Sequence, residues 1–160
     1  MKTHNYNTTV TWTGNLGQGT TNYKSYNRNH TIANPNKSQT ILASADPTFL
    51  GDDKRYNPEE LLLSSISSCH MLWYLHLCAT NNIIVTDYID YAEGIMQENK
   101  DGSGQFTSVT LHPKVTVADA SMITKANQLH HKANTMCFIA RSCNFPIIHN
   151  AFAEASPCKD

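Results

Sequence analysis

The sequence predicts an α+β fold in which antiparallel sheets pack around one long, buried central helix. Three observations lead to this prediction. Strand-like segments separated by glycine and Asn-Pro turns fill residues 1–50, the most apolar run covers residues 56–79, and a glycine-rich turn joins two further strands. A length of 160 residues suits one domain with its own core, so a single domain over 1–160 is expected.

The N-terminal strands are predicted from alternation of apolar and polar residues. Val10 and Trp12 alternate with threonines in "TTVTWTG", the segment "TNYKSYNRNHTI" alternates less cleanly, and "SQTILAS" forms a short apolar strand. The glycines of "GNLGQGT" and the segment "NPNK" supply turns between them. Residues 46–57 then read as a loop.

The long helix is predicted over residues 57–80. Asn57 is a good N-cap, Pro58 suits the first helical position, and Glu59 and Glu60 place negative charge in the first turn. From Leu61 onward the run is apolar on most sides, which indicates a helix buried at the centre of the fold. One small chain can hardly cover such a helix alone.

The remaining segments predict a hairpin over residues 83–117 and a second helix with a final strand over 119–150. The turn "KDGSG" joins the two strands of the hairpin. Asp119 caps the second helix, and a short helical piece and a strand around "FPIIHNAF" follow it. Its apolar face recurs at spacings of three and four, through Ile123, Ala126, Leu129 or His130, Ala133, and Met136 or Cys137.

Composition excludes several classes of protein. The formal net charge is −1 and no Lys or Arg cluster occurs, so nucleic acid is not an expected partner. The N-terminus has no apolar segment typical of a secretory signal, and no uninterrupted apolar run reaches about twenty residues. We therefore expect no membrane association, a cytoplasmic location, and cysteines present as thiols. The five cysteines include no C-x-x-C pair, which disfavours a disulfide scaffold or a zinc ribbon.

Cys69 lies in the middle of the apolar run, where two interpretations compete. A free cysteine in a buried helix is commonly a core residue, and burial alone would leave the thiol unreactive. An ordinary thiol is only about 3% ionised at pH 7, and lowering its pKa to about 6 takes roughly 3.4 kcal/mol. A buried guanidinium could supply this free energy. The candidates are Arg28, Arg55 and Arg141, and the residues alone do not choose among them.

The segment "YNPEELLLSSISSCHMLWYLHLCA" resembles the signature helix of the OsmC/Ohr family of peroxide-reducing proteins. The resemblance rests on Asn57, Pro58, Glu59 and a cysteine ten residues after the glutamate, Cys69. The later segment "HHKANTMCFIARS" resembles the one that carries the second cysteine of the family, here Cys137. Strand order, hairpin and length also agree, so the resemblance covers nearly the whole chain.

This resemblance implies an organic hydroperoxide reductase, an antioxidant enzyme of the stress response. Cys69 would form a sulfenic acid, Cys137 would resolve it to a redox-active disulfide, and a dithiol such as a lipoyl protein or dihydrolipoamide would reduce that disulfide. Arg28 takes the role of the arginine that activates the thiol, and Glu59 would hold its guanidinium. No cofactor is implied. The resemblance also implies an intertwined homodimer with its two sites at the subunit interface.

Two other readings compete with the peroxidase. Eight histidines and five cysteines suggest a metal site, but the adjacent pairs "HH" and "CH" diverge on a helix, so no bound metal is expected. A non-catalytic module of the same fold, binding a hydrophobic ligand in its pocket, is the alternative function. His70, which follows Cys69, is expected to pack or to contact a partner chain, and the other cysteines (Cys78, Cys143 and Cys158) are expected to be packing or incidental residues.

Overall fold

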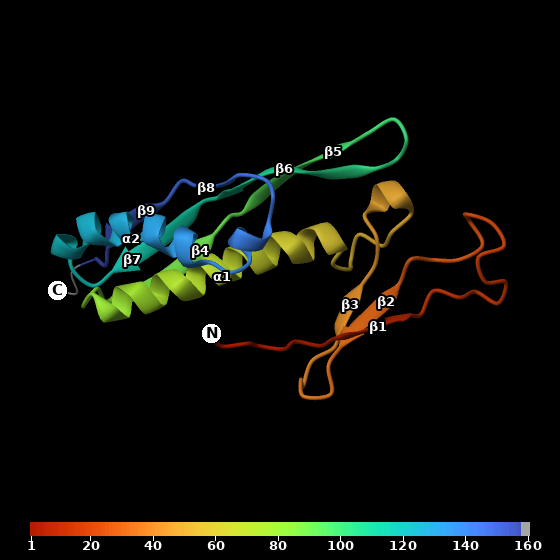
Figure 1. Ribbon diagram of the computed structural model, residues 1–160, viewed down its shortest axis with the longest axis horizontal. Helices are drawn as coiled ribbons and strands as arrows, with labels where there is room; N and C mark the ends of the chain where they lie inside the picture. Colours follow the sequence, from red (N-terminus) through yellow and green to blue (C-terminus); the bar gives the residue numbers. More distant parts are fainter. Residues whose placement is uncertain (158–160) are drawn as a thin grey trace. The chain divides into compact units, whose positions relative to one another are not determined.

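The computed structural model describes residues 1–157 and divides into two compact units. The N-terminal unit is Met1–Leu62, and the C-terminal unit begins at Leu63. Cys158 lies outside the described residues. Figure 1 shows the elements of both units, coloured along the chain.

The N-terminal unit contains one three-stranded antiparallel sheet. Its strands are β1 (Thr9–Trp12), β2 (His30–Ala33) and β3 (Ile41–Ala43), and β2 lies between the other two. Ile32 of β2 is the register partner of Val10 in β1 and of Ile41 in β3.

The second strand is shorter than the alternating pattern of residues 21–32 indicates. Local turns form both in its first part and just before it, where Asn15 Oδ1 accepts from the backbone N–H groups of Gly17 and Gly19. Asn22 Oδ1 accepts from the N–H of Lys24 in the same way. Asparagine side chains that bind nearby backbone groups compete with the ladder of a sheet, and this explains the late start of β2.

Helix α1 (Pro58–Thr80) confirms the predicted long helix and its start. Asn57 Oδ1 accepts from the N–H of Glu60 at 2.8 Å, and Glu60 Oε2 accepts from the N–H of Asn57 at 3.1 Å, which is a capping box. The preceding loop contains a short 3-10 helix, η1 (Pro47–Phe49), capped by Asp46. After Thr80 the chain leaves the helix through Asn82, whose φ of 59° is left-handed.

Burial of α1 on most sides, which the sequence predicts, does not occur within one chain. Its buried side chains recur at every fourth residue and form one stripe: Ile66, His70, Tyr74 and Cys78. Only 22% of its most apolar stretch is buried. By length and hydropathy α1 also meets the requirements of a membrane-spanning helix, as core helices of soluble domains often do.

The predicted hairpin consists of four strands rather than two. They are β4 (Val85–Asp90), β5 (Glu93–Glu98), β6 (Gly104–Leu111) and β7 (Pro113–Val117). β5 and β6 form the glycine-turned hairpin, whereas β4 pairs with β7 in a second sheet. Asp90 Oδ1 accepts from the N–H of His112 at 2.7 Å where the chain changes sheet. Pro113 has no N–H to continue the ladder there.

The C-terminal segment contains the second helix and two more strands. Asp119 caps the 3-10 helix η2 (Ala120–Met122), which leads into α2 (Ile123–Met136), and η3 (Ala140–Ser142) follows. The predicted final strand is two strands, β8 (Ile147–His149) and β9 (Phe152–Ala155). They pair parallel with β6 and β7 respectively, so the sheets of this unit are mixed rather than antiparallel.

One core joins α1, α2 and the sheet β4-β7-β9 in the C-terminal unit, and Figure 1 shows these elements side by side. Tyr74 and Cys78 of α1 pack there with Val115 and Val117 of β7 and with residues of α2 and β9, namely Ala126, Leu129, Ala133 and Ala153. This core fixes α1 beside α2, the two helices that carry Cys69 and Cys137.

Candidate functional site

The structure brings Cys69 and Cys137 together in the C-terminal unit. Cys69 is half-buried in the middle of α1, Cys137 is buried at the end of α2, and both are free thiols. Burial raises the pKa of Cys137, and a hydrogen bond with Cys69 raises it further. The side chains of the two cysteines therefore contact each other.

The end of α2 holds Cys137 in place. Its backbone N–H donates to the carbonyl oxygen of Ala133 at 3.0 Å, and its sulfur accepts from the N–H of Ala140 at 3.3 Å. The backbone of Cys137 is extended (φ −66°, ψ 112°), so the helix ends there and η3 begins after a short turn. The predicted apolar face of α2 includes Leu129, His130 and Cys137, all of them buried.

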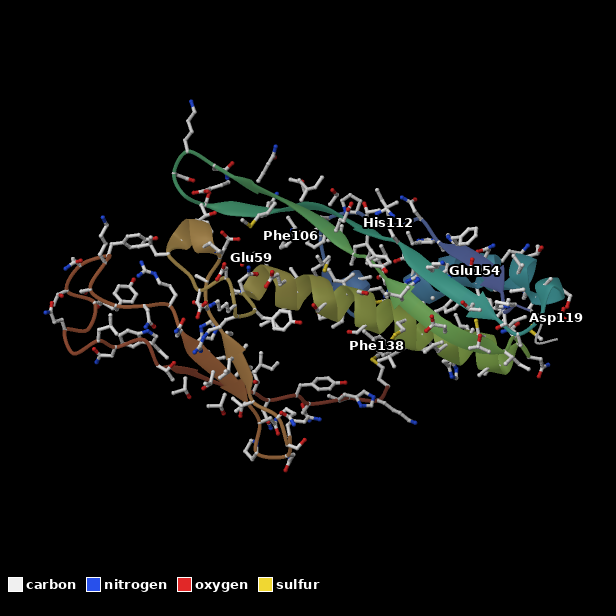
Figure 2. All side chains as sticks on the ribbon, turned by 180° about the vertical axis from the view of Figure 1, so that it is seen from behind. Glu59, Phe106, His112, Asp119, Phe138 and Glu154 are labelled. Carbon is white, nitrogen blue, oxygen red and sulfur yellow. The ribbon has the colours of Figure 1, made fainter. Side chains whose placement is uncertain are left out.

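Aromatic side chains lie beside the cysteines. Trp73 is one turn after Cys69 on α1, and Phe138 directly follows Cys137. The two rings meet edge to face, with centroids 5.6 Å apart. Figure 2 shows Phe138 alongside α1, and 67% of its surface is exposed. An exposed aromatic ring next to a thiol offers an apolar contact to a ligand.

Arg28 lies in the N-terminal unit, where two tyrosines hold its guanidinium. The guanidinium carbon is 4.3 Å from the ring centroids of both Tyr23 and Tyr26. Nη1 donates to the carbonyl oxygen of Tyr26 at 2.7 Å, and Nη2 donates to that of Tyr23 at 2.8 Å. These contacts fix the plane of the guanidinium and use two of its five N–H donors.

Glu59 is half-buried at the start of α1 (Figure 2). Among the ion pairs of residues 1–157, none joins Glu59 to Arg28. The other two arginines differ from Arg28 in their surroundings. Arg55 pairs with Asp52 at 3.2 Å, and Arg141 is exposed in η3.

Sequence reasoning did not predict that His70 and His130 form a buried pair. His70 Nε2 and His130 Nδ1 are 3.0 Å apart, and the two side chains are 1% and 0% exposed. The expectation that His70 packs is confirmed, since it lies on the buried stripe of α1. The signal in the sequence that could have indicated this pair was the position of each histidine. His70 directly follows Cys69, and His130 precedes Cys137 by two helical turns.

The other cysteines and histidines of the described residues have separate surroundings. Cys78 lies in the core, and the thiol of Cys143 donates to the carbonyl oxygen of Ile139 at 3.4 Å. Within residues 1–157, no group of three or more His, Cys, Asp or Glu side chains is arranged to hold a metal ion.

Comparison with known proteins shows the family to which the chain belongs. The family described as OsmC-like protein matches residues 51–150, which include α1, both cysteines and the hairpin. An OsmC-like protein of unknown function from Vibrio cholerae shares 31% identity over 94% of this chain and all of its own, with a TM-score of 0.84. No relative was found among curated proteins.

Structures of lower identity show the same fold. An OsmC-like protein from Mycoplasma pneumoniae has 15% identity and a TM-score of 0.70, covering 94% of this chain and 97% of its own. An organic hydroperoxide resistance protein from Elizabethkingia anophelis has 18% identity and a TM-score of 0.66, covering 98% and 100%. The chain has the α+β fold of this group, and it belongs to the OsmC-like protein family.

Proposed function

We propose that the protein is a thiol-dependent peroxidase that reduces organic hydroperoxides to alcohols. The contact between the side chains of Cys69 and Cys137 carries the proposal. It joins two sulfurs from different helices, which is the arrangement that disulfide formation needs. Burial raises the pKa of Cys137, so this thiol keeps its proton at pH 7.

The reaction proceeds in three balanced steps. The Cys69 thiolate attacks the terminal oxygen of the hydroperoxide, the O–O bond breaks, and the alkoxide takes a proton to leave as an alcohol. The sulfur of Cys137 then attacks the sulfur of the Cys69 sulfenic acid, the S–O bond breaks, and the thiol proton leaves with the hydroxide as water. An external dithiol restores both thiols by exchange. Family resemblance supports a lipoyl protein or dihydrolipoamide in this last role.

Arg28 and Glu59 complete the proposed catalytic set. Arg28 stabilises the thiolate of Cys69, and Glu59 orients the guanidinium through a charge-assisted pair. The aromatic contacts of Arg28 support this role, since a guanidinium whose plane is fixed loses less entropy when it binds a reacting group.

The direct test is a count of thiols after one equivalent of cumene hydroperoxide. Wild-type protein is expected to lose two thiols within seconds and to recover them with dihydrolipoamide. Cys69→Ser is expected to lose none rapidly, and Cys137→Ser to give a sulfenic acid that a dimedone probe traps by mass spectrometry. Persistence of both thiols in the wild type would reject the peroxidase and favour the module that binds a hydrophobic ligand.

The exposed ring of Phe138 predicts a preference for bulky, apolar hydroperoxides. Phe138→Ala removes the ring beside Cys137 and is expected to raise KM for cumene hydroperoxide about 5- to 10-fold, the effect of losing about 1–1.4 kcal/mol of apolar contact. Turnover of hydrogen peroxide should change little. Phe106→Ala, on β6, is the matched control because Phe106 pairs with Phe145 rather than with Trp73. An equal effect on both peroxides would contradict the preference.

We also propose a homodimer that covers the exposed apolar side of α1. Leu72 of α1 is an apolar side chain, and 63% of its surface is exposed. It lies in an apolar stretch of the helix that a second chain could cover. Sedimentation equilibrium without detergent is expected to give twice the chain mass of 17.8 kDa. Leu72→Glu should shift the protein toward the monomer, whereas Lys100→Glu, in the turn of the hairpin, should not. A monomer at every concentration would reject the dimer.

A further inference from the structure

Two buried imidazoles link the helices that carry the cysteines. His70 follows Cys69 on α1, and His130 lies seven residues before Cys137 on α2. Their ring nitrogens are 3.0 Å apart, and the rings are nearly coplanar, with an interplanar angle of 7°. This hydrogen bond ties α1 to α2 at the level of Cys69.

Two further aromatic side chains contact the pair. The ring of Tyr74 stacks on that of His130, with centroids 3.8 Å apart and an angle of 11°. The ring of His149, from β8, lies 5.7 Å from His70 and 6.4 Å from His130. Because burial lowers the pKa of both His70 and His130, both are neutral at pH 7, so one ring donates N–H and the other accepts.

Stability alone does not account for this pair. Within residues 1–157, the buried atoms His70 Nδ1 and His130 Nε2 have no hydrogen-bond partner. Leaving a buried polar group without a partner costs about 1–3 kcal/mol, and two apolar side chains of similar shape would avoid that cost. The imidazoles add a hydrogen bond, which is directional, between the two helices. A hydrogen bond constrains the sliding and rotation of one helix against the other, whereas apolar contacts tolerate more displacement.

We propose that His70 and His130 are positioning residues that hold Cys69 and Cys137 at the separation needed for disulfide formation. The role rests on the proposed function and deepens its second step. A disulfide requires Cα atoms about 4.4–6.8 Å apart and a Cβ–S–S–Cβ dihedral near 90°. A shift of about 1 Å between helices is enough to slow a step that depends on such alignment by about two orders of magnitude.

The pair acts through the helices rather than on the peroxide. Sulfenic acid formation at Cys69 is therefore expected to keep its rate when the pair is removed. Attack by Cys137, in which the S–S bond forms as the S–O bond breaks and water leaves, is expected to slow.

The test measures the effective concentration of Cys137 toward Cys69 in dithiothreitol redox buffers at pH 7.5. No peroxide is needed. His130→Phe keeps a ring that can stack on Tyr74 but removes the hydrogen bond, and it is expected to lower the effective concentration at least tenfold. His130→Met provides a second apolar variant if the first does not fold. His130→Gln retains a hydrogen-bonding side chain and is expected to recover most of the loss.

Leu129→Ala is the matched control for a merely structural role. Leu129 is the buried neighbour of His130 on α2, and its truncation destabilises the core without removing the hydrogen bond. It is expected to lower the melting temperature and leave the effective concentration within about twofold of the wild type. An unchanged value in the His130 variants, or an equal loss in Leu129→Ala, would overturn the role. Failure of cumene hydroperoxide to oxidise the same proteins would instead count against the peroxidase alone.

Discussion

Arg28→Ala is expected to slow the oxidation of Cys69 by cumene hydroperoxide about 30-fold or more at pH 7. Without a neighbouring cation, a thiol of ordinary pKa is only about 3% ionised at this pH, and only the thiolate attacks. The defect should shrink toward pH 9, where such a thiol is mostly ionised. Arg28→Lys is expected to recover little, because an ammonium group lacks the planar fork that Tyr23 and Tyr26 hold. Stopped-flow measurement of the second-order rate constant for Cys69 oxidation between pH 7 and pH 9 tests this prediction.

The other two arginines supply the controls for Arg28. Arg55→Ala removes a side chain that pairs with Asp52, and Arg141→Ala removes one that is exposed in η3. Both variants are expected to stay within about threefold of the wild-type rate. A large loss in Arg141→Ala with none in Arg28→Ala would assign the activation of Cys69 to Arg141 and reject the role of Arg28.

Acidification is expected to destabilise the protein between pH 6.5 and about 4. Burial, with a smaller effect from His149, lowers the pKa of His70 to about 4. Burial, with smaller effects from His70 and His149, lowers the pKa of His130 to about 3. The unfolded chain takes up protons below its histidine pKa of about 6.5 while the folded chain does not. The stability is therefore complete above pH 6.5 and is lost as the pH falls, by roughly 2 kcal/mol for each histidine at pH 5. Urea unfolding at pH 7.5, 6 and 5 measures the loss.

Variants separate this effect from the titration of other groups near the pair. The groups that face it are Tyr74 on α1 and His149 on β8, and His131 of α2 lies beside His149. The double variant His70→Gln/His130→Gln should remove most of the dependence between pH 7.5 and 5. His4→Gln, in the exposed N-terminal segment, should retain it. An equally steep dependence in the double variant would assign the acid sensitivity to His149 or to groups elsewhere.

Local patterns predicted the helices of this protein well. The order Asn57, Pro58, Glu59, Glu60 placed the start of α1 correctly, because capping depends on residues adjacent in the chain. The periodic apolar face of α2 and the cap at Asp119 were likewise predicted, although the first turn is a 3-10 helix. The family could also be assigned from two motifs, and the match over residues 51–150 confirms it.

Long-range pairing was less predictable. The hairpin of residues 83–117 appeared as two strands, but the chain changes sheet near Asp90 and His112, where a side chain takes over a backbone hydrogen bond. The parallel pairing of β8 and β9 was also missed, since a strand of three or four residues carries little pattern. Register and partner depend on contacts between distant segments, which periodicity does not record.

The sequence by itself determined the class of this protein: the capped apolar helix with Cys69, the second helix ending at Cys137, and membership of the OsmC-like family. Only the tertiary structure decided that Cys137 contacts Cys69, that Tyr23 and Tyr26 hold Arg28, and that His70 is paired with His130. The reason is physical. Helix caps and periodic faces follow from neighbours in the chain, whereas a hydrogen bond between two helices depends on the packing that brings them together.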